Sequence, residues 1–304
     1  MDTRDAGDLR DRLADALRGH GADYAEIRVE ETDATSLTYR GRTLEEVGRT
    51  SNLGGCVRAV VNGGWGFVSF NSLEGLRDRV GLAVRQARLV GGEGTTLAAV
   101  EPHVDVVVPA LRRDPASVSL DEKKRLMDEY VEAAWAVSPR IQTTNAGYGD
   151  ARRRVIFANS EGSYIDQSRF RVSARVQVLA RDGANVQQSR AAFSSPDDYD
   201  AVVGRHVEVG DAARRAVALL DAAAAPGGEF TVICDPALAA VFAHEAFGHL
   251  SEGDNVHENE RLRDIMVLGK RFGRPILNIA DGAAIGGQPG SFRYDDEGTP
   301  TRRT

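Results

Sequence analysis

The stretch RRVIFANSEGSYIDQSRFRVSARVQVLARDGANVQQSRAAF, residues 153–193, carries three strand patterns separated by two turns. The turns, Asn159–Gly162 and Arg181–Gly183, consist of residue types that favour tight connections between antiparallel strands. Apolar and polar residues alternate over Val172–Val178, which indicates that one face of the sheet is covered. The stretch therefore predicts an antiparallel meander with one buried face.

Helical patterns flank this meander on both sides. Ser119 and Glu122 have the spacing of a capping box, and an amphipathic helix follows them until Pro139 ends it. A second helix, predicted over residues 200–225, ends at Pro226 and the two glycines after it. Residues 113–226 are thus expected to form a unit of helix, meander and helix.

The N-terminal region repeats this plan without detectable repetition of its residues. A helical pattern stops at Gly19, and strand patterns follow over residues 24–31, 34–47 and 56–70, with Arg40–Arg42 and Asn62–Gly64 as hairpin turns. Asn71 and Glu74 have the spacing of another capping box, before a helix that runs to Gly91. Residues 91–116 contain several prolines and one short strand pattern, HVDVVV, and are predicted to be a linker.

The third region is shorter and rich in turns. It begins with an apolar strand pattern, EFTVICD, and a helix starting at Pro236; a later strand pattern is GRPILNIAD. The sequence as a whole predicts an α+β fold with two helix-plus-antiparallel-meander units, followed by the beginning of a third α+β domain. The expected domains are residues 1–112, 113–226 and 227–304.

Composition narrows the range of functions. The 304 residues are 42% apolar and 27% charged, with no apolar run of about 18 residues that could cross a bilayer. The N-terminus lacks the apolar core of a secretory signal, and Cys56 and Cys234 lie far apart, as in a reducing compartment. We therefore expect a soluble, cytoplasmic protein. A net charge of -7 without a basic block argues against nucleic acid or membrane as a partner.

The stretch AVFAHEAFGHLSEGD, residues 240–254, contains the candidate site. His244, Glu245 and His249 lie within six residues. Neutral imidazole is a common zinc ligand, and a neighbouring carboxylate can accept a proton from water in hydrolysis. These residue types are therefore the parts of a hydrolytic metal site.

The spacing of the two histidines requires a distorted helix. They are five residues apart, which places them about 140° apart around a regular α-helix, whereas a spacing of four gives about 40°. A π-turn returns such a pair to one side, and Gly248 lowers the cost of irregular backbone. We predict a local π-type expansion here.

Spacing alone leaves a non-metal interpretation open. His244 and His249 could each be an ordinary histidine satisfied by hydrogen bonds. We expect His257, in a highly charged stretch, to be solvated, and Cys234 to be a buried strand cysteine rather than a ligand. The remaining histidines, His20, His103 and His206, are expected to be structural or on the surface.

Several motifs together resemble those of the TldD/PmbA family of zinc metalloproteases, over nearly the whole chain. They are the histidine motif with Ser251–Asp254 behind it, the turn Asn159–Gly162, the segment GGCVRAVVNGGWGF from Gly54, and DDEGTP from Asp295. The resemblance implies a cytoplasmic peptidase that hydrolyses unfolded peptides, in peptide maturation or degradation. It also implies a dimer, with a PmbA-like (TldE) partner subunit or with a second copy.

The resemblance assigns roles to three residues. His244 and His249 would bind Zn²⁺, and Glu245 would be the general base. Family members continue beyond DDEGTP and take a third ligand from a later cysteine, but this sequence has no cysteine after Cys234. The resemblance therefore implies that this chain is a fragment or a truncated form, which would bind zinc weakly. Peptidase activity is then expected of the intact protein rather than of these residues alone.

Two other functions are compatible with the sequence. The chain could be a non-catalytic, peptide-binding or scaffold subunit of such a dimer. It could also bind a small molecule in its glycine-rich segments, although GGCVRAVVNGGWG lacks the strand-to-helix placement of a phosphate loop.

Overall fold

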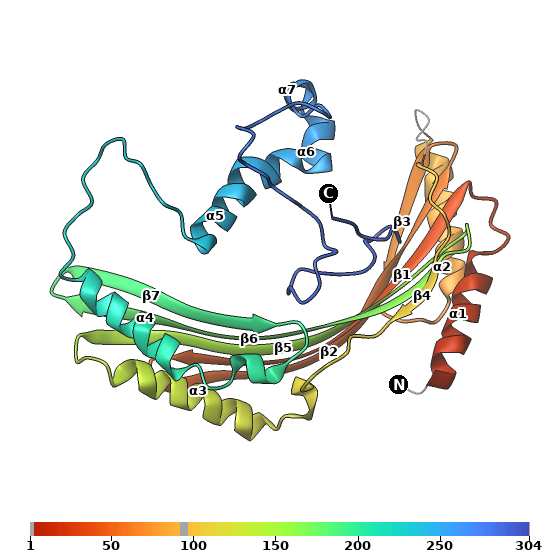
Figure 1. Cartoon of the computed structure of the whole chain (residues 1–304). Helices are drawn as coiled ribbons and strands as arrows, with labels where there is room; N and C mark the ends of the chain where they lie inside the picture. The colour runs from red at the N-terminus through yellow and green to blue at the C-terminus, as the bar shows by residue number, and fades with distance from the viewer. Residues whose placement is uncertain (1–2, 92–96, 304) are drawn as a thin grey trace. The chain divides into compact units, whose positions relative to one another are not determined.

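The computed structural model describes residues 3–91 and 97–303, and the chain forms two compact units (Figure 1). The first comprises residues 1–222 together with 284–301, and we call it the sheet unit. The second comprises residues 223–283 with 302–304, and we call it the motif unit because it contains the histidine motif.

One sheet of seven strands forms the sheet unit, in the order β3-β2-β1-β5-β6-β4, with β7 also paired to β6. All neighbours are antiparallel except β4 and β6, which are parallel. The strands are β1 (Tyr24–Arg40), β2 (Thr43–Val61), β3 (Gly64–Phe70), β4 (Val104–Val107), β5 (Ile141–Asn159), β6 (Tyr164–Asp182) and β7 (Asn185–Ser195). The predicted α+β class with antiparallel meanders is confirmed.

The two predicted meanders are joined side by side. β1 pairs with β5 along its length, from Glu26 opposite Asn159 to Arg40 opposite Asn145. Strands from residues 1–112 and from residues 113–226 therefore share one continuous hydrogen-bonded ladder. The division into three domains at these boundaries remains a prediction.

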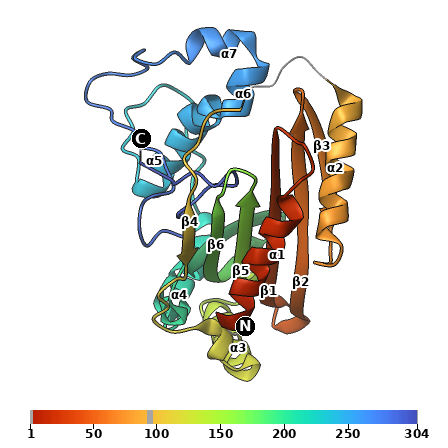
Figure 2. The same cartoon turned by 90° about the vertical axis from the view of Figure 1, so that its right-hand side faces the viewer.

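Four helices cover one face of this sheet (Figures 1 and 2). They are α1 (Thr3–Leu17), α2 (Leu76–Val90), α3 (Leu120–Trp135) and α4 (His206–Leu219). Figure 1 shows α1 and α2 at one end of the strands, and Figure 2 views the sheet from that end. A Cβ on Gly66 of β3 would lie 1.9 Å from the Ala83 carbonyl oxygen of α2, so this glycine allows close packing and has a structural role.

The helix-covered face carries two separate hydrophobic cores. Along β1, Ile27 and Val29 belong to the core beneath α1 and α2, and Leu37 and Tyr39 belong to the core beneath α3 and α4. The positions between them on the same face are Glu31, Asp33 and Thr35. On this face the strands are thus apolar at both ends and polar in the middle. The polar middle separates the two hydrophobic cores, although the sheet itself is continuous.

Buried ion pairs stabilise this polar band. Arg154 Nη2 lies 2.6 Å from Asp166 Oδ2, and Lys123 Nζ lies 2.7 Å from Asp150 Oδ2. Asp150 also accepts a hydrogen bond of 2.7 Å from the Tyr148 hydroxyl. Buried charges need such partners because an unpaired buried ion loses its hydration free energy and gains no interaction that compensates for it.

Several predicted boundaries need correction. The helix predicted after Asn71 begins only at Leu76, preceded by Gly75 in a left-handed conformation without a side-chain cap. The Ser119 cap is confirmed, because Ser119 Oγ accepts from the Glu122 amide at 3.2 Å. The helix predicted over 200–225 is instead a short 3-10 turn, Tyr199–Val202, followed by the shorter α4. A further 3-10 turn is Pro115–Ser117.

The motif unit consists of short helices and loops. They are α5 (Pro236–Ala243), a π-helix (His244–Gly248), a 3-10 turn (His249–Ser251), α6 (Gly253–Glu258) and α7 (Glu260–Ile265). The strands predicted over 229–235 and 273–281 are wrong, since neither segment has a strand partner in the described chain. Among the described residues, no helix is long and apolar enough to span a membrane.

The DDEGTP turn docks onto the face of the sheet that the helices leave uncovered. Gln167 Nε2 donates to the Tyr294 carbonyl at 2.8 Å, and the Tyr294 hydroxyl donates to Asp105 at 2.7 Å. Asp296 pairs with Arg28, and Gly298, with φ of 80°, lies against Phe157. This turn therefore belongs structurally to the sheet unit, although it lies late in the sequence.

Candidate metal centre

The helix of the histidine motif is capped at its start and distorted at its end. Asp235 accepts a hydrogen bond of 2.8 Å from the Leu238 amide, with Pro236 in the first turn. After α5 the backbone enters the π-helix His244–Gly248, where the His249 amide donates to the His244 carbonyl, five residues earlier. The predicted π-type expansion is confirmed.

The distortion brings the predicted site residues together. The rings of His244 and His249 have centroids 4.3 Å apart and planes inclined by 68°. One ligating atom from each of His244, Glu245 and His249 lies within 4.8 Å of the others. All three side chains are exposed, so a metal ion could reach them from solvent.

Glu252, which the sequence pattern did not single out, orients His249. His249 Nδ1 lies 2.7 Å from Glu252 Oε1. Because a carboxylate only accepts, the ring donates from Nδ1 and keeps the lone pair of Nε2 for a ligand. Asn255 Nδ2 in turn donates to Glu252 at 2.9 Å and to the His249 carbonyl at 3.0 Å.

The chemistry of these donors fits zinc. Zinc takes imidazole nitrogen and carboxylate oxygen in tetrahedral sites, and the motif offers two imidazoles and one carboxylate within reach of a common point. Neither Cys234 nor His257 belongs to this group. Cys234 is exposed in a loop, so the expectation of a buried strand cysteine is wrong. His257 is exposed, as expected of a solvated residue.

The other three histidines have contacts within the sheet unit. His20 Nε2 lies 2.9 Å from the Ala16 carbonyl, and His206 Nε2 lies 3.2 Å from Glu129. The His103 ring lies 5.8 Å from that of Tyr294. These contacts agree with the structural role expected for them.

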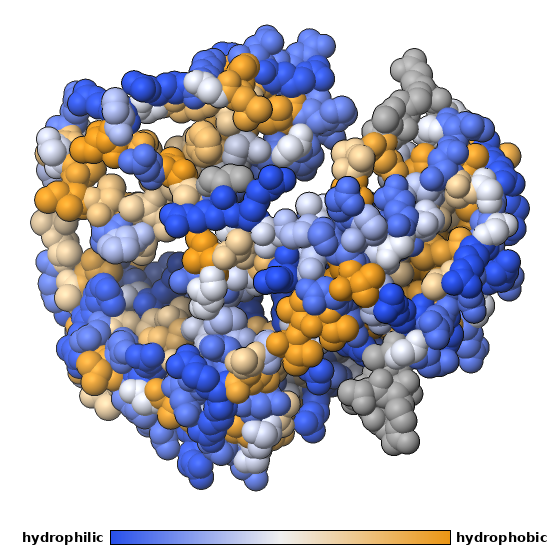
Figure 3. Space-filling model, turned by 45° about the vertical axis from the view of Figure 1, so that its right-hand side comes forward, coloured by the Kyte–Doolittle hydropathy of each residue, from blue (hydrophilic) through white to orange (hydrophobic). Residues whose placement is uncertain are grey.

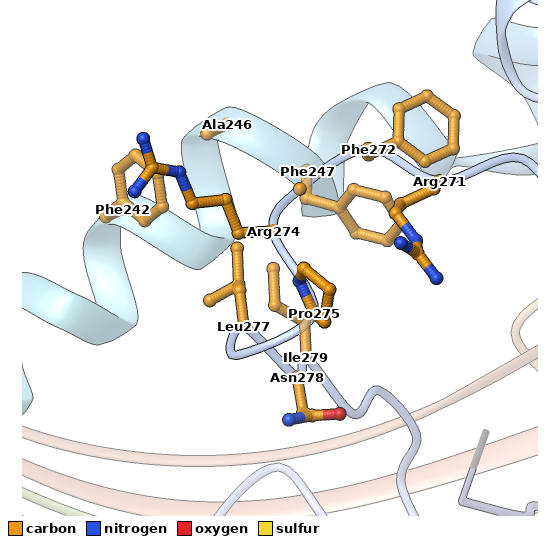
Figure 4. A pocket seen from close by; sticks show the side chains of 11 residues that line it. Phe242, Ala246, Phe247, Arg271, Phe272, Arg274, Pro275, Leu277, Asn278 and Ile279 are labelled. Carbon is orange, nitrogen blue, oxygen red and sulfur yellow. The ribbon is translucent and has the colours of Figure 1, made fainter.

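A pocket of about 500 Å³ adjoins the motif, lined by apolar side chains together with Arg271, Arg274 and Asn278 (Figure 4). Figure 4 shows Phe242 and Phe247 from the distorted helix beside Phe272 and Leu277 from the following loop. None of His244, Glu245 and His249 lines this pocket. It is therefore a separate feature of the motif unit.

Family models match most of the chain. Residues 25–87 match domain 1 of the PmbA/TldA metallopeptidases, residues 113–220 match the central domain, and residues 227–304 match the C-terminal domain. His244, Glu245 and His249 lie in the third of these regions. The first two regions supply most of the strands and helices of the sheet unit, whereas α1 and β4 lie outside them.

Curated relatives are named metalloproteases. The chain is 39% identical to the metalloprotease slr0863 of Synechocystis over 93% of this chain and 61% of that protein. It is 31% identical to the metalloprotease MJ0996 of Methanocaldococcus jannaschii, over 93% and 63%. A zinc metalloprotease TldD homolog of Saccharolobus solfataricus is 25% identical, over 93% and 62%. The chain thus spans less than two thirds of the length of these relatives.

Solved structures share the fold. A putative modulator of DNA gyrase from Bacteroides thetaiotaomicron superposes with a TM-score of 0.84 at 20% identity, covering 100% of this chain and 70% of that one. TldE from Thermococcus kodakarensis gives 0.54 at 16% identity, covering 69% and 47%. With the family models and the relatives above, these similarities lead to one conclusion: the chain belongs to the PmbA/TldD family of metallopeptidases.

Proposed function

We propose that this chain provides the zinc-binding and catalytic residues of a peptidase that hydrolyses unfolded peptides, in peptide maturation or degradation. The observation that carries the proposal is the π-helix, because it places one ligating atom from each of His244, Glu245 and His249 within 4.8 Å of one another. The names of the curated relatives support the same reaction class. Their names leave the peptide undefined.

Each residue has a distinct task in this proposal. His244 and His249 would hold zinc, and zinc supplies a Lewis acid for water and for a peptide carbonyl. Glu245, whose carboxylate lies 3.9 Å from His249 Nε2, accepts a proton from water and returns it to the leaving amine. Glu252 holds the His249 ring in the orientation that presents Nε2.

With Glu245 kept as the base, the described residues give zinc two imidazole ligands. Catalytic zinc sites usually have three protein ligands, so we expect this chain alone to bind zinc weakly. We propose that the whole protein acts as a cytoplasmic dimer, either with a TldE-type subunit or with a second copy. The third ligand would then come from polypeptide beyond these residues.

Metal stoichiometry tests the site without requiring activity. Purified chain is dialysed against zinc and its bound metal measured by mass spectrometry, for the wild type and for His244→Ala and His249→Ala. We expect both substitutions to remove the bound zinc. The matched control is His257→Ala, which changes an exposed histidine outside the group and should keep it. Equal zinc in all four proteins would overturn the proposed site.

The base role is tested separately. Glu245→Gln should retain zinc while hydrolysis of an unfolded, fluorescence-quenched peptide by the intact assembly falls by about 10²–10⁴-fold. Retained hydrolysis would remove Glu245 from the mechanism. The second candidate function, a non-catalytic peptide-binding or scaffold subunit, is favoured if the chain binds the peptide yet carries no zinc. The exposure of all three site residues is compatible with that alternative.

A further inference from the structure

We propose that the helix-free face of the sheet binds an extended peptide, and that it does so through the carboxylate side chains of that peptide. The helix-free face is the side of the sheet opposite α1–α4 (Figure 1). This inference rests on the proposed function, in which the substrate is a peptide, and it adds that acidic peptides are preferred.

Register places arginines side by side on this face. Across four strands, Arg40 of β1 lies opposite Asn145 of β5, Asn145 opposite Gln177 of β6, and Gln177 opposite Arg190 of β7. Arg175 lies two residues before Gln177, on the same face. Arg175 and Arg190 are therefore diagonal neighbours, with a separation of about 7 Å between their positions on the sheet.

The arginines surround a depression of about 550 Å³. Its lining includes Arg40, Arg175 and Arg190 together with the amides of Asn145 and Gln177. All of these groups belong to the sheet unit, and both kinds can donate hydrogen bonds to a carboxylate. Glu45 also lines the depression, so the lining carries three arginines, one carboxylate and two neutral donors, with a net positive charge.

Two of these guanidinium groups lack a protein partner. In the described part of the chain, Arg175 and Arg190 are exposed and make no hydrogen bond or ion pair, and the same holds for Arg171, farther along β6. Arg40 Nε lies 3.1 Å from Glu45, which shows the kind of contact available at the edge of the depression. In a chain with a net charge of -7, three unpaired arginines on one face are a local reversal of charge.

Small residues beside the arginines leave room for a peptide backbone. On the same face, another row of paired residues crosses five strands, from β2 to β7, near the row of Arg40 and Arg190. Its members are Gly48, Ser36, Gly149, Ser173 and Ser194. Side chains this short let another chain approach the sheet surface closely, while guanidinium groups beside them can grip carboxylates through paired hydrogen bonds. Charge and shape therefore both favour an extended acidic segment.

Peptide binding by the full chain tests the proposal directly. Fluorescein-labelled, unstructured peptides with alternating glutamate and serine, or lysine and serine, are titrated with the protein, and binding is followed by fluorescence anisotropy. We expect the acidic peptide to bind more tightly than the basic one, and its affinity to fall as salt increases. The double substitution Arg175→Glu with Arg190→Glu should weaken acidic-peptide binding about tenfold or more.

The matched control reverses two charges elsewhere. Arg85 of α2 and Arg125 of α3 are exposed on the helices that cover the other face and make no ion pair within the described residues. Arg85→Glu with Arg125→Glu should therefore leave the affinity unchanged, and circular dichroism verifies the fold of both variants. Equal losses in the two double variants, or equal binding of both peptides, would overturn the proposal.

Two further arms identify the ligand class and separate this proposal from the peptidase proposal. A single-stranded oligonucleotide of the same charge should compete poorly, and equal competition would show a general anion surface instead of a peptide site. Peptide binding should be unchanged by a zinc chelator, since His244, Glu245 and His249 do not line the depression. Failure of hydrolysis with binding retained would count against the proposed function only.

Discussion

The sheet unit and the motif unit differ in what happens to their apolar residues. In α3, an amphipathic helix of the sheet unit, Leu126, Met127 and Tyr130 are buried against the strands. In α5, whose sequence PALAAVFA is more apolar than that of α3, no residue is buried. Apolar character alone therefore does not make a core, because burial also requires a facing surface of matching shape.

The contrast extends over the whole of residues 223–283, all of which the structure describes. No residue in this range is buried, and Ile233 and Leu268 have relative exposures of 99% and 101%. Large apolar side chains also reach the surface elsewhere (Figure 3), but in the sheet unit they accompany two packed cores. We infer that the sheet unit carries nearly all of the folding free energy of this chain.

The largest difference between the units should appear when a buried charge is left alone. Lys123→Met removes the partner of Asp150, and both side chains of this pair are nearly inaccessible. We expect the free energy of unfolding to fall by about 3–5 kcal/mol. The same change at Lys270, which is exposed in the motif unit, should alter it by less than about 0.5 kcal/mol. Urea unfolding followed by far-UV circular dichroism measures both values, and similar values would contradict the comparison.

A matched pair of leucine truncations tests the cores directly. Leu13 of α1 is completely buried in the core between this helix and the sheet, and Leu268 is fully exposed. Leu13→Ala should cost about 2–5 kcal/mol of unfolding free energy, from lost burial and from the cavity that remains. Leu268→Ala should be close to neutral. A large loss at Leu268 would mean that the motif unit has a core of its own under native conditions.

Two glycines with the same backbone conformation sharpen the comparison further. Gly298 and Gly269 have φ of 80° and 82°, but an added Cβ would lie 2.8 Å from the Phe157 ring at Gly298 and in open space at Gly269. Gly298→Ala should cost about 2–3 kcal/mol, combining backbone strain with a clash. Gly269→Ala should cost about 1 kcal/mol or less, as strain only. Unfolding curves that coincide would show that the DDEGTP turn does not pack as described.

Alkaline pH offers the smallest and most selective test. All seven tyrosines lie in the sheet unit. Burial raises the pKa of Tyr199 from 10.0 to about 12. Because the folded-state pKa is the higher one, the stability from keeping this hydroxyl neutral is complete below pH 10 and is lost as pH rises toward 12. Tyr199→Phe should reduce this loss, measured as the pH dependence of the unfolding free energy, and an unchanged slope would contradict it.

The same substitution has a second expected result near neutral pH. The Tyr199 hydroxyl is one of the buried polar atoms without a hydrogen-bond partner in the described structure. Removing it relieves the cost of burying an unsatisfied group, so Tyr199→Phe should be neutral or slightly stabilising. A clear loss of stability would indicate that the hydroxyl has a partner.

The sequence predicted three strand patterns and two turns in each meander, although not the full lengths of β1 and β2. It did not predict that the two meanders form one sheet. The reason lies in β1, where Glu31, Asp33 and Thr35 interrupt the apolar pattern. This single strand of 17 residues therefore has the sequence pattern of two shorter strands. Residues that pair with charges on neighbouring strands cannot be distinguished from loop residues by periodicity alone.

In the motif unit the outcome was reversed. The site was predicted because the five-residue spacing of His244 and His249 can converge only through a π-turn, which the backbone adopts. The strands over 229–235 and 273–281 were predicted from apolar runs that have no partner strand. Glu252 was overlooked as the residue that orients His249, although its spacing of three from that histidine was a usable signal.

The docked DDEGTP turn has a topological consequence for the motif unit. Residues 223–283 leave the sheet unit after α4 and return to it through residues 284–301, so they form a closed excursion rather than a tail. The return is secured by the hydrogen bonds of Tyr294 and the ion pair of Asp296. A single proteolytic nick within the excursion would therefore release no fragment from the native protein, and two pieces would separate only after denaturation.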